Sequence, residues 1–204
     1  MVQFIIISFL IIFVLWLNYE IGKNNRLSNK GKDDFWKKES QANTTRKADI
    51  SNLDYIAIPI ERLPLEDSPD QTINSYRDTI LSQSSKKILN LSGISNTELK
   101  LKYGAPNLTL LTEYDNNYAI MVAVLHKWGE RLYINSYYKE AIAVLEVALD
   151  CRTDVYKTFE LVAKIYSEKG LFDKINLLED RISSSSIRNK ETLLSKLEEL
   201  KRSK

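Results

Sequence analysis

Two stretches of this chain repeat one another at a spacing of about 34 residues, and this period constrains the fold more than any other feature. Each residue of the first stretch and the residue 34 positions later are of the same kind: both are large and apolar, both are small, or both are typical of turns. The one exception is the pair Leu145 and Glu179. The first series is Leu125, Trp128, Gly129, Leu132, Ser136, Tyr138, Ala141, Leu145 and Ala148, and the second is Phe159, Val162, Ala163, Tyr166, Gly170, Phe172, Ile175, Glu179 and Ile182. A period of this length indicates a helix–turn–helix unit that buries its apolar face by stacking on a neighbouring unit.

The two units resemble the tetratricopeptide repeat, because the residue types that this family favours recur at the family's positions. The first unit supplies Leu125, Trp128-Gly129, Leu132, Asn135-Ser136, Tyr138, Ala141 and Ala148, and the second supplies Phe159, Val162-Ala163, Tyr166, Gly170, Phe172, Ile175 and Ile182. Ile replaces the family's Ala at two positions of the second unit, and the usual closing Pro is missing from both units. The alternative is a set of antiparallel helices whose phase agrees by accident.

The resemblance implies an all-α protein with a short solenoid of helical hairpins, in which the repeats cover about residues 122–155 and 156–189. A polar helix at 189–203 continues the phase through Leu193 and Leu197, and such capping helices protect the open end of a solenoid. The segment from Leu91 to Leu108 is also similar to stretches of uncharacterised bacterial membrane-anchored proteins.

The sequence predicts three helices that begin before the first repeat. We count them with the repeats, so the helical repeat domain is expected to cover residues 67–204. Ser68 with Pro69 begins a helix that runs to about Asn90. Ser95 begins a short helix that ends near Gly104. The third helix opens at residues 112–115 and continues into the first repeat.

Residues 1–17 are apolar apart from Gln3 and Ser8. A helix extended to Ile21 would be about 30 Å long, which matches the apolar core of a bilayer. The alternative is a cleaved signal peptide, which needs a basic start and small residues at a cleavage site, and this segment has neither. We therefore expect residues 1–21 to form a transmembrane anchor that contacts the lipid bilayer through residues 2–21.

Six basic residues lie between Asn18 and Lys38, and none precedes the apolar run. Basic flanks stay on the cytoplasmic side, so the sequence predicts a single-pass cell-membrane protein with its N-terminus outside and its repeat domain in the cytoplasm. The lone Cys151 fits a reducing compartment. Residues 22–52 are polar and show no sustained period, which predicts a flexible basic linker that is either solvated or in contact with anionic lipid.

Residues 53–66 are too apolar for a loose linker, and Pro59 and Pro64 argue against a helix or a central strand. We expect an extended arm that packs on the helical domain. Two positions are open for it: the outside of the domain, or the groove of its own repeats.

No catalytic or metal-binding constellation is visible. The chain has one His, His126, and one Cys, so a Cys/His metal site lacks ligands. Its six glycines are isolated, so no phosphate-binding loop is present. The 29 basic and 27 acidic residues nearly balance, which leaves no electrostatic footprint for nucleic acid. We expect a protein that is not an enzyme, that uses no cofactor or metal and that does not bind nucleic acid.

The resemblance further implies that the first helix of each repeat lines a concave binding surface. At the positions of that surface the first unit presents Ala123, His126, Lys127, Glu130 and Tyr133, and the second presents Lys157, Glu160, Leu161, Lys164 and Ser167. The residues expected to contact another protein or a peptide segment are His126, Lys127, Glu130, Tyr133, Lys157, Glu160 and Lys164. The alternatives are a solvated face and a face covered by the arm.

These observations favour a membrane-tethered protein–protein interaction scaffold that recruits its partner through a tetratricopeptide-like domain. The alternative is a structural subunit that stays permanently associated with a membrane protein complex. The two hypotheses differ in whether the partner dissociates on dilution.

Overall fold

The computed structural model describes the backbone of residues 2–184, 187 and 189–202, and the side chains of these residues except 2–9, 11, 24–31 and 184. Over this part of the chain every regular element is an α-helix or a 3₁₀ helix, and no strand is found. The all-α class expected from the sequence is therefore confirmed. The chain divides into two compact units, residues 1–50 with 93–109 and residues 51–92 with 110–204.

The first unit joins the end of a long N-terminal helix to a short one. Its elements are α1 (Val2–Thr44), α3 (Asn96–Tyr103) and the 3₁₀ helix η2 (Ala105–Asn107). Glu39 of α1 accepts hydrogen bonds from Lys100 and from Thr97 Oγ1 of α3, the latter at 2.6 Å. Asn107 Nδ2 donates to the Ala48 carbonyl oxygen at 2.8 Å, which holds the segment after α1 against η2.

The bounds of α3 follow from its end residues, as the sequence predicts. Ser95 Oγ accepts from the Glu98 N–H, and the Glu98 carboxylate accepts from the Ser95 N–H at 2.9 Å, which completes a capping box. The helix ends at Gly104, whose φ of 89° is left-handed. A Cβ on this residue would lie 2.2 Å from the Arg46 carbonyl oxygen, so the close approach of the two segments requires glycine.

Residues 22–52 differ from the flexible linker that the sequence predicts. The helix α1 continues to Thr44, and the Ala48 N–H donates to the Tyr103 carbonyl oxygen at 3.0 Å. No apolar period marks this stretch, so its helix does not form by burying an apolar face. Polar contacts with α3 hold its C-terminal end.

The predicted transmembrane anchor, residues 1–21, falls in part on residues 1–9 and 11, whose side chains lie outside the described part of the structure. Among the residues that are described, no helix has the length and the apolar character that a bilayer crossing requires.

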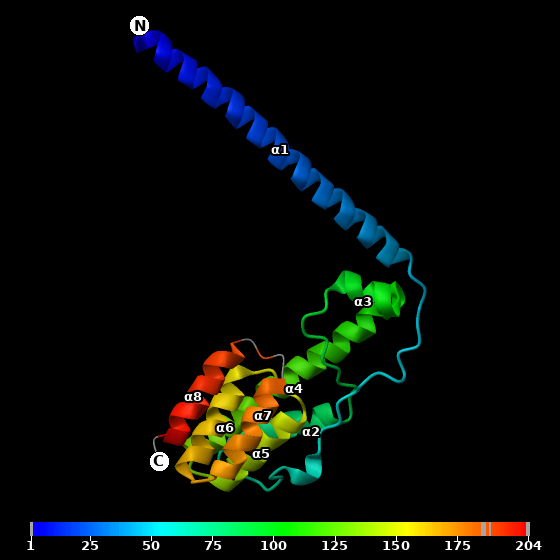
Figure 1. The fold of residues 1–204 in the computed structure, drawn as a ribbon. Helices are drawn as coiled ribbons and strands as arrows, with labels where there is room; N and C mark the ends of the chain where they lie inside the picture. The colour runs from blue at the N-terminus through cyan, green and yellow to red at the C-terminus, as the bar shows by residue number, and fades with distance from the viewer. Residues whose placement is uncertain (1, 185–186, 188, 203–204) are drawn as a thin grey trace. The chain divides into compact units, whose positions relative to one another are not determined.

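The second unit contains the arm and the repeat region. Its elements are η1 (Ile60–Arg62), α2 (Gln71–Ser84), nearly all of α4 (Leu108–Ile134), α5 (Tyr138–Asp150), α6 (Tyr156–Glu168), α7 (Phe172–Ser184) and α8 (Lys190–Arg202). Figure 1 shows α5 to α8 packed beside one another, with α6 in contact with α5, α7 and α8. One cluster of buried apolar side chains runs from Ile58 in the arm to Leu197 in α8. Trp128, one of the large apolar residues of the repeat pattern, is fully buried in this cluster.

The helix bounds repeat with the period of the sequence. Both ends of α7 lie one period after those of α5, both ends of α8 lie one period after those of α6, and α6 ends one period after α4. The turns inside the hairpins repeat as well, because Ser136 and Gly170 both have a left-handed backbone, with φ of 65° and 68°. The same backbone hydrogen bond closes both turns, from Tyr137 N to Leu132 O at 2.9 Å and from Leu171 N to Tyr166 O at 2.8 Å.

The one exception to the repeat pattern has a packing reason. Gly129 lies so close to α5 that a Cβ there would come within 2.5 Å of Leu145 Cδ2. The corresponding residues of the second hairpin are Ala163 and Glu179. Glu179 forms an ion pair with Lys201 of α8, so the polar residue stands where α7 meets the polar last helix.

Residues 53–66 have no regular structure apart from η1, and they lie on the helical region. The arm buries Ile58 and Leu63 in the core, and η1 contacts α5. The Ile56 N–H donates to the Ile88 carbonyl oxygen at 2.9 Å, which ties the arm to the segment after α2.

Two helices begin or end away from the expected residues. The N-cap of α2 is Asp70 and not Ser68, because Asp70 Oδ1 accepts from the Thr72 N–H at 2.9 Å. This helix ends at Ser84, before the Asn90 expected from the sequence. α4 begins at Leu108, before residues 112–115, because η2 leads directly into it.

Candidate protein-binding surface

The first helices of the two hairpins, α4 and α6, carry the seven residues that the sequence identifies as a candidate surface. α4 supplies His126, Lys127, Glu130 and Tyr133, and α6 supplies Lys157, Glu160 and Lys164. Side chains from the two helices meet at two points of this surface, and α8 continues it beyond α6.

His126 forms the first contact between α4 and α6. Its Nδ1 lies 3.2 Å from Oγ1 of the fully buried Thr158. Burial lowers the pKa of His126 below its usual value; Glu130 acts in the opposite sense, and Lys157 and Lys127 act in the same sense as burial. His126 is therefore neutral at neutral pH, and it serves as a hydrogen-bonding group rather than as a charge.

Tyr133 forms the second contact. Its hydroxyl donates to the Glu168 carboxylate at 2.9 Å, and Lys164 Nζ lies 5.1 Å from the centroid of its ring. The ring also stands edge to face against Tyr138, with the two centroids 5.7 Å apart. An aromatic ring is thus held between a cation and an anion, and part of it stays accessible at the surface.

Lys196 of α8 extends this surface beyond α6. It pairs with Glu160 and lies 5.7 Å from the centroid of the Tyr156 ring. Within the described residues, the side chains that form no ion pair or hydrogen bond on this surface are those of Lys127, Glu130 and Lys157.

The arm makes its polar contacts away from this surface. In the part of the chain that the structure describes, no hydrogen bond, ion pair or ring contact joins residues 53–66 to any of the seven residues. The arm instead directs Arg62 to Glu146 and Asp150 on α5, the second helix of the first hairpin. Of the two positions open to the arm, these contacts favour the outside of the domain.

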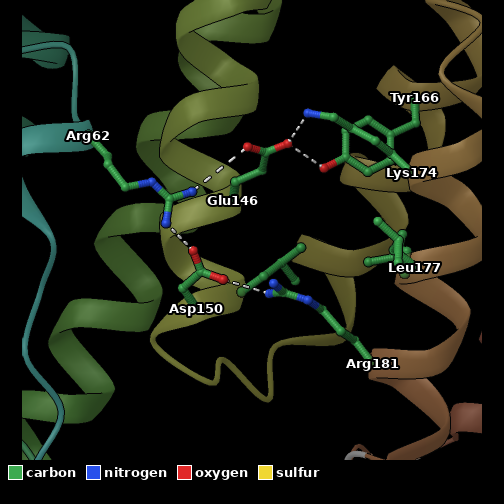
Figure 2. Close-up of a pocket in the computed structure, with 9 residues that line it drawn as sticks. Arg62, Glu146, Asp150, Tyr166, Lys174, Leu177 and Arg181 are labelled. Carbon is green, nitrogen blue, oxygen red and sulfur yellow. Dashed lines mark hydrogen bonds and ion pairs between the residues drawn. The ribbon is translucent and has the colours of Figure 1, made fainter.

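A charged pocket with a cavity volume of about 180 Å³ lies between α5, α7 and the arm (Figure 2). Glu146 of α5 accepts hydrogen bonds from the Tyr166 hydroxyl at 2.8 Å and from Lys174 Nζ at 2.6 Å. Arg62 approaches the same carboxylate from the arm side, at 3.9 Å. Three elements therefore converge on one side chain of α5.

Asp150, one turn after Glu146, links the arm to α7. Its carboxylate accepts hydrogen bonds from Arg62 and, at 2.8 Å, from Arg181 (Figure 2). Burial by itself raises the pKa of Asp150, but the hydrogen bonds from Arg181 and Arg62 outweigh burial and hold this pKa below its usual value. The carboxylate is therefore ionised at neutral pH.

Sequence reasoning missed this charged pocket. Glu146 and Asp150 are one helical turn apart, so a helix places them on one face, and this signal is present in the sequence. Arg62 is 88 residues from Asp150, and no spacing rule pairs residues at that separation. The fold alone brings the arm to α5.

The charged residues of these sites join one helix to another through hydrogen bonds and ion pairs. Among the described residues, no group of three or more His, Cys, Asp or Glu side chains is arranged to hold a metal ion. Burial raises the pKa of the Cys151 thiol to about 11, so this residue is a packed thiol at neutral pH.

Comparison with models of known families, with curated proteins and with solved structures found no match to this chain. The resemblance to the tetratricopeptide repeat therefore rests on the residue pattern and on helix bounds that follow the same period.

Proposed function

We propose that the hairpins α4–α5 and α6–α7, closed by α8, form a tetratricopeptide-like module that binds another protein through the surface of its first helices. The observation that carries this proposal is the position of the arm. The arm packs on the second helix α5, and among the residues described it makes no polar or ring contact with the seven surface residues, which supports a face that a partner can reach. A module of this kind uses stacked first helices as an extended binding surface.

The side chains of this surface favour a partner segment of mixed charge. Lys127 and Lys157 offer cations, Glu130 offers an anion, and Tyr133 offers a ring edge. A strongly acidic or strongly basic segment would meet like charges here, which reduces affinity.

The proposal includes attachment to a membrane through the N-terminal apolar run. Ile12 to Leu17 are six consecutive apolar residues of α1, and all of them are exposed. A helix that is apolar on every side requires an apolar environment, which a membrane offers. The basic residues after the run favour a cytoplasmic position for the repeats. Together these features support a membrane-tethered scaffold.

Co-purification from gently solubilised membranes, followed by mass spectrometry, tests the proposal. We expect a partner with the wild-type chain, and a loss of that partner with Lys127→Glu combined with Lys157→Glu. The matched control, Lys86→Glu with Lys139→Glu, makes the same charge change away from the surface and should retain the partner. Equal recovery with both double variants would contradict a binding role for the first helices. A stoichiometric partner that survives dilution would identify the alternative, a permanent structural subunit.

A further inference from the structure

A row of exposed side chains runs along one face of α4. Its members, called the α4 row from here on, are Ile120, Ala123, Lys127, Glu130 and Ile134. They are spaced alternately by three and four residues, and a helix places residues at these spacings on one face. The row is about 21 Å long, because a helix rises about 1.5 Å per residue.

The α4 row is apolar at both ends and charged between them. Ile120 is 42% exposed and Ile134 is 63% exposed. In the part of the chain that the structure describes, Lys127 and Glu130 form no ion pair or hydrogen bond. Two apolar contacts and two opposite charges are therefore presented together on one line.

The spacing of the α4 row suits a second helix as its occupant. Alternation of three and four residues over two heptads is the pattern through which two helices pack side by side. The row has no amide side chain to pair with the backbone of an extended segment, whereas a helix satisfies its own backbone hydrogen bonds. These features favour a helix over an extended segment.

The α4 row is complementary to an antiparallel copy of itself. When Lys127 lies opposite Glu130 of a second copy, two-fold symmetry places Glu130 opposite Lys127 of that copy. The same register places Ala123 opposite Ile134 in both directions, so a small side chain faces a large one. A parallel copy would instead place Lys127 opposite Lys127 and Glu130 opposite Glu130, which is unfavourable.

We propose that two copies of this chain associate through their α4 rows, packed antiparallel about a two-fold axis. The inference rests on the proposed function, because Lys127 and Glu130 belong to the proposed surface, and it names a second copy as the protein that occupies this part of it. Lys157 and Lys164 of α6 lie outside the row. A contact between two helices of this length is smaller than a permanent interface, so the dimer is reversible.

Charge exchange tests the pairing of Lys127 with Glu130. Sedimentation equilibrium of the full chain in mild detergent measures the dissociation constant of the dimer. Lys127→Glu should raise this constant at least about tenfold, because it places two carboxylates opposite each other at two symmetric points. Lys127→Glu combined with Glu130→Lys should restore the wild-type value, because the two charges only change places. Lys86→Glu, the same charge change outside the row, should leave the constant unchanged.

Disulfide trapping tests the antiparallel register. Ala123→Cys combined with Ile134→Cys should give a disulfide-linked dimer on mild oxidation of the full chain, because the register places these two positions opposite each other. Each single variant should give none, since its two thiols would lie about 16 Å apart along the helix axis, beyond the reach of a disulfide. Cys151 is buried, so it does not compete with the introduced thiols.

The two proposals fail in different ways. The pairing is overturned if the wild-type chain sediments as a monomer up to its solubility limit, if the charge-exchanged variant associates no better than Lys127→Glu, or if Ala123→Cys alone forms the disulfide. A monomer that still captures another protein through Lys127 and Lys157 would overturn the pairing and leave the proposed function standing. A dimer that captures no other protein would support the pairing and contradict recruitment of a different partner.

Discussion

The two hairpins of the repeat region have the same turns and second helices of the same length, but they fill their interiors differently. In the first hairpin Gly129 admits the fully buried Leu145 against α4. In the second, Ala163 takes the place of the glycine, and the opposing residue, Glu179, pairs with Lys201 instead. The comparison teaches that the small-residue position and its opposing position differ together between the two hairpins, so we expect their effects on stability to be coupled.

A second difference between the hairpins concerns which helix carries the larger side chain at corresponding positions. Trp128 corresponds to Val162, while Ala141 and Ala148 correspond to Ile175 and Ile182, and all of these side chains are buried. At these three pairs of positions, the larger side chain lies on the first helix in the first hairpin and on the second helix in the second hairpin. Cores tolerate such exchanges when the total volume is kept.

The largest effect is expected from truncating the side chain that fills the first hairpin. Trp128→Ala should reduce the free energy of unfolding by about 3–5 kcal/mol, since it leaves a cavity in a buried site. Val162→Ala, the matched change in the second hairpin, should cost about 2 kcal/mol, because it removes two methyl groups. Denaturant unfolding of the full chain in mild detergent measures both. Equal losses, or a Trp128→Ala loss below about 1 kcal/mol, would show that the hairpins do not differ as described.

The glycine position gives the next effect. Gly129→Ala should destabilise the chain by about 1–2 kcal/mol, because overpacking against Leu145 exceeds the gain of about 1 kcal/mol in helix propensity. In a Leu145→Ala background the same change should become stabilising. Ala163→Gly in the second hairpin should cost about 1 kcal/mol from propensity alone. A thermodynamic cycle over these variants measures the coupling, and additive effects would contradict the pairing of the two positions.

Substitutions in the turns should change the stability less, and with opposite signs in the two hairpins. Ser136 is strained in a left-handed backbone that Gly170 adopts freely. Ser136→Gly should stabilise the chain by about 1 kcal/mol, and Gly170→Ala should destabilise it by about the same amount. Thermal unfolding of both variants checks this, and a loss of stability in Ser136→Gly would mean that its turn is not left-handed.

The smallest effect concerns the ionic link between the hairpins. The pKa of Asp150 is lowered in the folded chain, so its contribution is full above the unfolded value of about 3.9 and is lost as pH falls through the lower folded value. Asp150→Asn should cost about 0.5–1 kcal/mol at neutral pH, and the difference from wild type should vanish in acid. Denaturant unfolding between neutral pH and about pH 2 measures this difference. A cost of Asp150→Asn that persists unchanged at about pH 2 would contradict this account of the ionic link.

The sequence predicts the repeat region well because its information there is periodic. The pattern places Trp128 in the core, where the structure has it, and the period of the sequence returns in the bounds of α5 to α8. The capping box at Ser95 is equally predictable, since its two partners are close in the sequence. Local spacing determines each of these features.

Features that depend on long-range contacts are not predictable in the same way. The helix over residues 22–44 has no apolar period, and part of its support comes from Lys100 in α3. The charged pocket depends on where the arm lies, and an extended segment with two prolines carries no signal for its docking site. The seven surface residues lie together on neighbouring helices, but their role stays a prediction.

Site-specific photo-crosslinking in cells tests the central claim, that a partner binds the first helices of both hairpins. A benzophenone amino acid is placed at Lys127, at Lys157 or at Leu177, which is exposed on the second helix α7. The account predicts crosslinks to one and the same protein from Lys127 and Lys157 and none from Leu177. Crosslinks from Leu177 alone would place the partner on the second helices and contradict the account.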